Sequence, residues 1–199
     1  MRYPYDIRII AGKHRGRRVA IPELKDIRPT ANRSRQAVFN MLTHARNGFS
    51  AIIGARVLDL YTGTGALGLE ALSRGAEHVT FVDTKTDLAR QNVEAMGEQD
   101  QATIITADAT QLPKADEPYD IIFMDPPYNQ NLIQKTIDML VKNGYIDERA
   151  ILVIESSMEE EYELPGHMRQ FDERVYGMSR FAFSSPVVQA ERRTRTKVA

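Results

Sequence analysis

The sequence predicts an α/β protein built on a doubly wound, mostly parallel sheet. From residue 56 onward, short β-branched or aliphatic runs alternate with stretches of helical periodicity. The predicted strands are 57–60, 78–82, 103–106, 119–124 and 151–154, and the predicted helices between them are 66–73, 86–96 and 132–141. Such alternation is typical of a buried parallel sheet that carries helices on both faces and is joined by right-handed crossovers.

Two further runs, 170–176 and 179–183, complete the predicted sheet. Gly177 lies between them, so we expect an antiparallel hairpin after the parallel strands. Together with the five parallel strands, this hairpin makes a seven-stranded, Rossmann-like sheet. Residues 51–185 therefore form one α/β domain, and the length of 199 residues suits a single domain with a small appendage.

Segments at both ends lie outside this domain. Two short runs around Gly12 and Gly16 predict a small basic β-hairpin, and a helix is predicted after Pro29. We expect residues 1–50 to form the appendage. Residues 186–199 form a basic tail of the kind that is often disordered at chain termini.

The composition excludes several classes of protein. The chain has no cysteine, which excludes a disulfide scaffold, a cysteine-ligated zinc or iron-sulfur site and a thiol nucleophile. No apolar stretch approaches the ~18 residues that span a bilayer, and the basic N-terminus has no apolar signal core. We therefore expect a soluble, cytoplasmic protein.

The formal net charge of -1 hides an asymmetry along the chain. Residues 8–35 contain nine basic and two acidic side chains, whereas residues 36–190 contain 12 basic and 23 acidic side chains. Four more basic residues lie in the tail. A polyanionic partner would therefore meet the ends of the chain and not its middle, although a charged run can also be an ordinary solvated surface.

A glycine-rich turn follows the first predicted strand of the domain. Gly63, Gly65 and Gly68 form a G-x-G-x-x-G pattern that leads into a helix. Glycines in this position allow a tight strand-to-helix turn and the close approach of a ligand. Asp83, at the end of the next strand, can accept hydrogen bonds from ribose hydroxyls. A nicotinamide dinucleotide and S-adenosylmethionine both satisfy this much of the pattern.

Asp59 favours S-adenosylmethionine over the dinucleotide. It lies four residues before Gly63, where a carboxylate would repel the pyrophosphate of a dinucleotide in a poorly screened cleft. S-adenosylmethionine has no phosphate, and its ammonium and sulfonium groups are attracted to an acid. The alternative for Asp59 is an acid at a strand end that is held by backbone N–H groups.

Asp108 and Ala109, after the third strand, are positioned to contact adenine, although Asp108 is equally well explained as a loop acid.

The most specific motif is the run from Asp125 to Tyr128, with Pro126 and Pro127 between them. It follows an apolar strand directly. The prolines fix the backbone, so the Asp125 carboxylate and the Pro126 carbonyl form a rigid pair of acceptors. Such a pair fits an amino group on a planar ring, and Tyr128 can stack on that ring. The alternative is a structural Pro-Pro turn, which is less consistent with Asp59 and Asp83 upstream.

With these motifs the sequence resembles the class I S-adenosylmethionine-dependent methyltransferases, and more narrowly the bacterial 16S ribosomal RNA guanine-N2 methyltransferases of the RsmD type. The resemblance runs from about residue 8 to residue 183. It is carried by the basic stretch at residues 8–16, by Arg28-Pro29-Thr30, by the stretch from Leu58 to Ala76 and by the D-P-P-Y run.

The resemblance implies roles for particular residues. Residues 51–185 would be the methyltransferase domain and S-adenosylmethionine the cofactor, with no metal. It implies that Asp59, Gly63, Gly65, Asp83 and Asp108 bind the cofactor and that the D-P-P-Y run holds the target guanine. The partner would be 16S rRNA, within the small subunit or an assembly intermediate. RNA contacts are expected from Lys13, Arg15, Arg17, Arg28 and Arg33, and His14 stands where this family commonly has a larger aromatic residue.

Other functions share some of these features. A DNA methyltransferase acting on adenine N6 or cytosine N4 would share D-P-P-Y, but 199 residues leave little room for a target-recognition region. A protein-glutamine methyltransferase would give no reason for the basic segment. A non-catalytic RNA-binding assembly factor with the same fold would not need Asp59, Asp83 and D-P-P-Y together.

Overall fold

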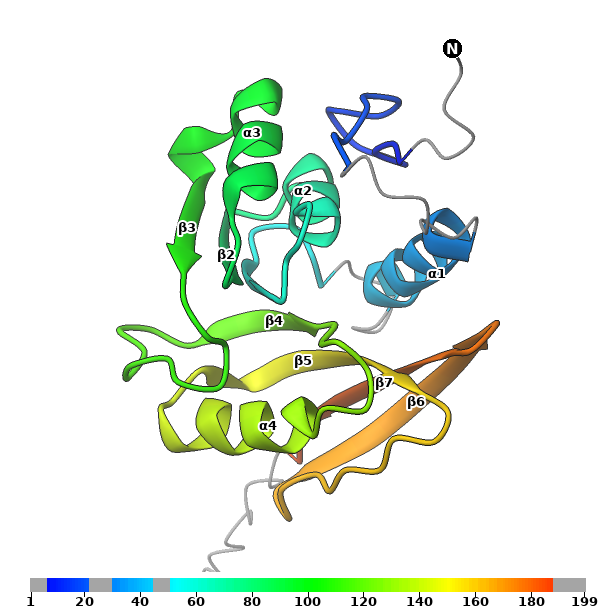
Figure 1. Ribbon diagram of the computed structural model, residues 1–199, viewed down its shortest axis with the longest axis vertical. Coiled ribbons are helices and arrows are strands. Elements are labelled where there is room, and N and C mark those ends of the chain that lie inside the picture. Colours follow the sequence, from blue (N-terminus) through cyan, green and yellow to red (C-terminus); the bar gives the residue numbers. More distant parts are fainter. Residues whose placement is uncertain (1–6, 22–29, 45–50, 188–199) are drawn as a thin grey trace, which may run out of the picture.

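Seven strands form one sheet in the order β3-β2-β1-β4-β5-β7-β6. The computed structural model describes residues 7–21, 30–44 and 51–187 (Figure 1). The parallel strands are β1 (Arg56–Leu60), β2 (His78–Asp83), β3 (Ala102–Thr106), β4 (Tyr119–Met124) and β5 (Ile146–Ser157). The antiparallel strands are β6 (Met168–Tyr176) and β7 (Ser179–Pro186). The predicted α/β fold, with a C-terminal hairpin on a parallel sheet, is confirmed.

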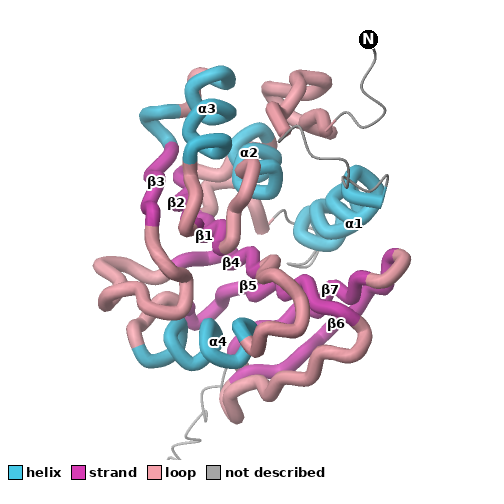
Figure 2. The backbone as a smooth tube through the Cα atoms, in the orientation of Figure 1, coloured by secondary structure: helices cyan, strands magenta, loops and turns pink. Residues whose placement is uncertain are grey.

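Helices cover both faces of the sheet (Figures 1 and 2). One face carries α1 (Thr30–His44), α2 (Ala66–Ser73) and α3 (Asp87–Met96), and the other carries α4 (Leu132–Lys142). A short 3-10 turn, η1 (Gln99–Gln101), connects α3 to β3. The two helical layers explain why the central strands β1 and β4 bury residues on both faces, since a sheet covered on both faces has no polar side.

Alternate residues of each strand enter different cores. Val57 of β1 packs with the cluster that contains Phe39 of α1 and Leu69 of α2. The next residue, Leu58, packs with the cluster that contains Ile137 of α4. Successive side chains of a strand point to opposite faces, so β1 contributes to both cores. This central position fixes the end of β1, from which the glycine turn departs.

Two strands differ from the prediction. The third predicted strand was expected to be buried, but β3 lies at the edge of the sheet and Ile105 is 38% exposed. Among the described strands it pairs with β2 alone, and the segment that leads from β3 to β4 is a loop and not a covering helix. The strand β5 begins at Ile146, before the predicted start at residue 151. The prediction missed its first residues because several of them are polar and lack the apolar pattern of a buried strand.

The predicted basic β-hairpin is also different. Residues 7–21, which we call the arm, reverse direction, but they form one isolated antiparallel bridge, between Arg8 and Arg18, and not two strands. The backbone N–H groups of Ile10 and Ala11 donate instead to the carboxylate of Glu70 in α2, at 2.7 and 3.0 Å. A side chain therefore takes the donors that a strand ladder would need. Ile9 and Val19 enter the core from the arm.

Glu70 is the fully buried group that fixes the arm to the domain. Besides the two arm N–H groups, its carboxylate accepts a hydrogen bond from Arg74 Nε at 2.7 Å. Arg35 of α1, also buried, lies 3.8 Å away. One carboxylate thus connects α1, α2 and the arm.

We predict that Glu70→Ala lowers the free energy of unfolding by about 3 to 5 kcal/mol, because it leaves buried arginines and arm N–H groups without their acceptor. Urea unfolding of the two proteins measures the difference. The control is Glu94→Ala on the exposed side of α3, which should change stability by less than about 0.5 kcal/mol. Equal stability of the Glu70→Ala protein and the parent would show that this carboxylate does not hold the arm.

Candidate active site

A cavity of about 580 Å³ lies at the carboxyl ends of the parallel strands. Its walls come from the segments that follow β1, β2, β3 and β4, together with the start of α4; the lining includes Tyr61, Asp83, Asp108, Ala109, Asp125, Pro126, Pro127 and Tyr128. The strand order reverses beside β1, which has β2 on one side and β4 on the other. Ligands of open α/β sheets bind in the crevice at such a reversal.

The glycine turn is held from beneath by Asp59. This residue is 1% exposed, and its Oδ2 atom accepts hydrogen bonds from the Thr62 hydroxyl at 2.7 Å and from the Gly68 N–H at 3.0 Å. Burial raises the pKa of Asp59 to about 7, against the opposing effect of these hydrogen bonds. The carboxyl thus organises the turn, as the alternative interpretation of this residue proposed, and it also lines a second cavity behind the turn.

The glycines of the turn meet two separate constraints. Gly65 has a φ of 78° at the start of α2, a conformation that residues with a side chain rarely adopt. Gly68 faces the sheet, and a Cβ atom there would lie 2.3 Å from Phe81 of β2. The turn therefore needs glycine at one position for backbone conformation and at another for packing.

Asp83 and Asp108 occupy the ends of β2 and β3 beside the cavity. Asp83 Oδ2 accepts a hydrogen bond from the Gly63 N–H at 2.9 Å, so the end of β2 and the glycine turn are joined. Asp108 accepts hydrogen bonds from the Thr110 side chain and N–H, which lower its pKa, and Ala109 beside it is buried. Each acid is held in place within its own loop.

The D-P-P-Y run forms the far wall of the same cavity. Asp125 is an exposed residue that lines the cavity, although many protein atoms surround its carboxyl group. This desolvation and then the neighbouring Glu155 and Asp59 carboxyls raise the pKa of Asp125 well above its usual range. The Tyr128 hydroxyl donates to Glu155 Oε1 at 2.9 Å and lies 2.7 Å from the Ser179 hydroxyl. Burial raises the pKa of Tyr128 to about 12, so the phenol is neutral.

A second cavity of about 410 Å³ lies on the other side of this run. It is lined by residues of α1, the glycine turn, β5 and the β6–β7 hairpin, among them Ser34, Arg35, Glu155, Tyr176 and Ser179. Tyr61, Asp125 and Tyr128 line both cavities. The D-P-P-Y run thus stands between two spaces, which is the arrangement that a transfer between two bound molecules requires.

Two residues of this site, Glu155 and Ser179, belong to none of the sequence motifs. Glu155 follows the buried run of β5, just as Asp83 and Asp125 stand at the ends of β2 and β4. That shared position is the signal that could have found it. Ser179 lies in an antiparallel strand and belongs to no motif.

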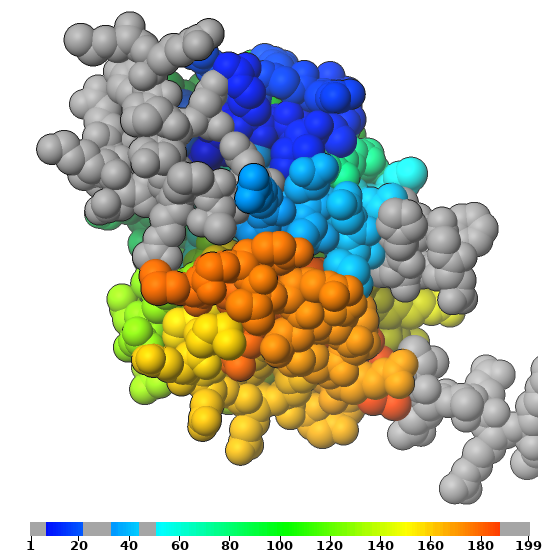
Figure 3. All heavy atoms as spheres, turned by 90° about the vertical axis from the view of Figure 1, so that its right-hand side faces the viewer, coloured from blue at the N-terminus to red at the C-terminus, as the bar shows by residue number. Residues whose placement is uncertain are grey.

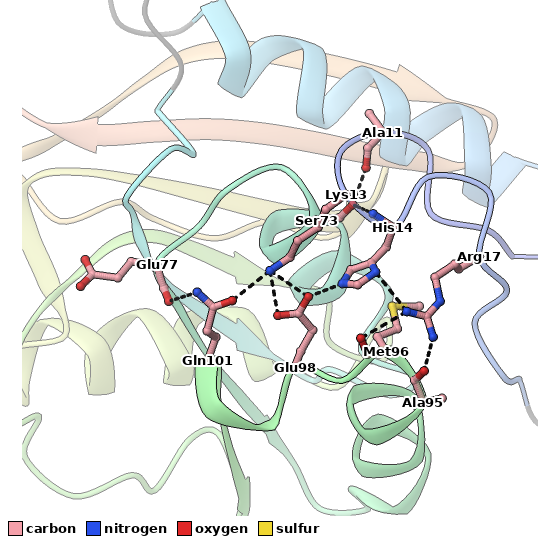
Figure 4. Close-up of polar contacts among 10 residues, drawn as sticks. All are labelled: Ala11, Lys13, His14, Arg17, Ser73, Glu77, Ala95, Met96, Glu98 and Gln101. Carbon is pink, nitrogen blue, oxygen red and sulfur yellow. Dashed lines mark hydrogen bonds and ion pairs between the residues drawn. The ribbon is translucent and has the colours of Figure 1, made fainter.

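Two basic residues of the arm, Lys13 and Arg17, bind groups around the end of α3 (Figure 4). Lys13 Nζ lies 2.9 Å from Glu98 Oε1 and donates to Gln101 Oε1 at 2.9 Å. Arg17 donates to the carbonyls of Ala95 and Met96 at the C-terminal end of α3, where a cation complements the helix dipole. Both residues therefore fasten the arm.

The remaining candidates for RNA contact are placed differently. Arg15 and Arg33 are exposed, whereas Arg28 lies outside the described residues.

His14 also anchors the arm, through a hydrogen bond between its Nε2 atom and Glu98. Figure 3 shows α1, which carries Arg33, between the arm and β6 on one face of the molecule.

Asn92 of α3 ties the arm to the glycine turn. Its side chain accepts a hydrogen bond from the Ala20 N–H at 2.7 Å and donates to the Thr64 carbonyl at 2.8 Å. Asn92 is 1% exposed. The positions of arm and turn are therefore coupled through one buried amide.

The lining of the larger cavity indicates the charge of its ligand. Among the described residues, its lining contains the carboxyl groups of Asp83, Asp108 and Asp125 and no lysine or arginine. Such a lining disfavours a phosphate-bearing ligand, whereas the ammonium and sulfonium groups of S-adenosylmethionine suit these acids. Within the described ranges, no group of three or more His, Cys, Asp or Glu side chains is placed to hold a metal ion, and no helix is long and apolar enough to cross a membrane.

The sheet order, the glycine turn with an acid at the end of β2, and the D-P-P-Y run after β4 define a class I S-adenosylmethionine-dependent methyltransferase, with S-adenosylmethionine as its cofactor. Comparison with known proteins agrees. The family described as "Conserved hypothetical protein 95" matches residues 7–185. The chain belongs to this family, which is the RsmD family of methyltransferases.

Individual relatives support this membership. The "Ribosomal RNA small subunit methyltransferase D" of Escherichia coli (strain K12) is 35% identical over 156 residues, which cover 77% of this chain and 76% of the relative. The solved structure described as "Putative methyltransferase yhhF from Escherichia coli" has a TM-score of 0.79 at 32% identity, covering 93% of this chain and 100% of that one. The Thermus thermophilus "16S rRNA N2 G1207 methyltransferase (RsmC)", at 18% identity and a TM-score of 0.65, covers 92% of this chain and 50% of its own and shows the same fold.

We predict that the double substitution Lys13→Ala and Arg17→Ala loosens the arm while the rest of the fold stays intact. Losing charge-assisted hydrogen bonds worth about 1 to 3 kcal/mol each should speed amide exchange in residues 7–21 by at least ~10-fold. Hydrogen–deuterium exchange mass spectrometry measures this, with β4 and β5 as the internal reference. Arg15→Ala is the matched control and should leave the exchange unchanged. Unaltered protection of the arm in the double variant would refute the anchoring role.

Proposed function

We propose that this protein transfers a methyl group from S-adenosylmethionine to the exocyclic N2 amine of a guanine in 16S ribosomal RNA of the small subunit. The observation that carries the proposal is the D-P-P-Y run beside two cavities, one acidic and one lined by residues of α1 and the β6–β7 hairpin. Relatives named for methylation of small-subunit ribosomal RNA support RNA as the substrate class. The particular base and the N2 position are the part that experiment must establish.

The 580 Å³ cavity is the proposed cofactor site. Asp83 is placed to accept from ribose hydroxyls and Asp108 from an adenine amine, beside Ala109. Gly63, Gly65 and Gly68 let the backbone approach, with Asp59 beneath them as support. When bound, the cofactor supplies a methyl group on a sulfonium, an electrophile that needs an aligned nucleophile.

The 410 Å³ cavity is the proposed base site. The lone pair of the guanine amine is delocalised into the ring, so the amine is a poor nucleophile and positioning must do most of the catalysis. The Asp125 carboxylate and the Pro126 carbonyl are fixed by Pro126 and Pro127 as acceptors for the two amine hydrogens. Tyr128 offers a stacking surface for a base that has left its helix, and its hydroxyl contacts hold the ring in position.

The exposed basic residues are the proposed RNA-facing groups. Arg15 and Arg33 are exposed; Lys13 and Arg17 are also exposed, but they bind groups of the domain that fasten the arm. The arm and α1 together would therefore offer phosphate contacts at the edge of the base cavity, which α1 helps to line.

The test is transfer of labelled methyl from S-adenosylmethionine to unmodified small subunits, naked rRNA and DNA, followed by nucleoside analysis. We expect N2-methylguanosine from the ribosomal substrates. Methylated adenine or cytosine from DNA would instead support a DNA methyltransferase. No transfer to any substrate, despite cofactor binding, would support the non-catalytic binding factor.

We predict that Asp83→Ala weakens S-adenosylmethionine binding by about 1 to 3 kcal/mol, the cost of losing a charge-assisted partner and the acceptor that holds Gly63. Isothermal titration calorimetry measures the affinity. Asp87→Ala, an exposed acid in the first turn of α3, is the control and should bind like the parent. An unchanged affinity for the Asp83→Ala protein would remove this residue from the cofactor site.

We predict that Asp125→Asn lowers the single-turnover rate of methyl transfer by at least ~10²-fold. The amide is a weaker acceptor and carries no charge to attract the amine as it becomes positive, so the loss falls on turnover more than on binding. Rapid-quench measurement gives the rate, and calorimetry should show cofactor affinity within a few fold of the parent. A near-normal rate would mean that the D-P-P-Y run is structural in this protein.

A further inference from the structure

Asp125 and Glu155 are neighbours because of the strand register. Strands β4 and β5 run parallel, with Met124 beside Ile154, and each acid is the next residue along its strand. Both acids line the same cavity, and the neighbouring carboxyl of Glu155 raises the pKa of Asp125. Two like charges this close favour a proton on one of the two carboxyl groups. The cavity proposed to hold the base therefore presents a pair of adjacent carboxyl groups.

Glu155 is held in a fixed orientation. The Tyr128 hydroxyl donates to its Oε1 atom at 2.9 Å, and the same hydroxyl lies 2.7 Å from Ser179 Oγ of β7. Glu155 lines the base cavity and not the cofactor cavity, whereas Asp125 lines both. Its chemistry is thus directed at the substrate and not at the cofactor.

The edge of guanine matches such a pair. Beside its N2 amine, guanine has an N1–H, so two neighbouring ring groups both donate hydrogen bonds. Beside the amine of adenine or cytosine stands a ring nitrogen with a lone pair, which a second carboxylate would repel. A site built to accept from a substrate N–H discriminates strongly against an analogue without it, because the site's own polar group is left unpaired.

We propose that Glu155 determines the choice of base, by accepting a hydrogen bond from the guanine N1–H while Asp125 accepts from the N2 amine. This inference rests on the proposed function and adds the residue that reads the base. The two carboxyl groups accept these hydrogen bonds best when they are ionised, so a proton carried by either acid passes to solvent when the base enters. The bond that forms in the reaction is unaffected by Glu155, whose role is recognition.

Other charged or titratable groups also face this pair and define its environment. They are Asp59 from β1, Tyr61 from the segment after β1, Tyr128 from the D-P-P-Y run, Arg35 from α1 and Tyr176 from β6. Burial and the carboxyl of Glu155 both raise the pKa of Asp125. Removing the Glu155 charge should therefore lower the pKa of Asp125 and move the rise of rate with pH to lower pH.

The test compares two bases at one position. The nucleotide methylated by the wild-type protein is first mapped by mass spectrometry, and RNA is then ligated with guanine or 2-aminopurine at that position. 2-Aminopurine keeps the 2-amine and replaces the N1–H by a lone pair. Wild-type protein should prefer guanine in kcat/KM by at least ~10²-fold, as expected when a hydrogen-bonding site loses its partner. Glu155→Gln should reduce the preference to below ~10-fold, because an amide can donate to the lone pair.

The absence of the 6-oxygen in 2-aminopurine affects both proteins alike, so the change in preference isolates the N1 contact. Ser179→Ala is the control: it removes one partner of Tyr128 and leaves the carboxyl pair, and its preference should equal that of the wild type. If Glu155→Gln turns over too slowly, competition binding of the two RNAs gives the same ratio, and thermal unfolding checks that the variant is folded.

The outcomes separate the two levels of the proposal. An unchanged preference in Glu155→Gln, with a pH profile that matches the wild type, overturns the role of Glu155 and leaves the proposed function standing. Absence of N2-methylguanosine from the wild-type reaction overturns the proposed function itself. A reduced preference together with a shift of the profile to lower pH supports the assignment.

Discussion

The geometry of both cavities depends on the buried carboxyl of Asp59. It sits at the centre of the sheet and accepts from Thr62 and Gly68, so the glycine turn has one arrangement over the end of β1. Asp83 completes that arrangement from β2. A buried acid is costly unless its acceptors are used, and here they set the boundary between the cofactor cavity and the space behind it. The hydrogen bonds of Asp59 join residues that are close in the sequence, but the shapes of both cavities depend on them.

In the folded protein, acidic residues from the middle of the chain bind the basic arm. Glu70 and Glu98 bind backbone and cationic groups of the arm, and Asn92 joins the arm to the turn. The basic residues of the arm thus have two roles: they fasten the arm to the domain, and they are the proposed contacts with RNA. Because the arm is coupled to the turn through Asn92, a shift of the arm would also displace the backbone beside the cofactor cavity.

The sequence allowed the fold and the centre of the site to be predicted, since periodicity, the glycine turn and the D-P-P-Y run depend on neighbouring residues. The edge position of β3 could not be predicted, because exposure depends on strand order. Glu155 was missed because only the register of β5 against β4 places it beside Asp125. Lys13 and Arg17 were expected to meet RNA, but whether a cation faces a partner or a helix end is decided by tertiary contacts far along the chain.

The base cavity takes Ile7 from the beginning of the described chain and Phe181 from near its end, and β7 lies between β5 and β6. A ribosome releases a protein from its N-terminus, so the parallel strands and the glycine turn emerge well before the strand that supplies Ser179. A nascent chain can therefore build the cofactor cavity while the space for a base is still unfinished. We expect the proposed base cavity to be completed after the cofactor cavity, when β7 inserts beside β5.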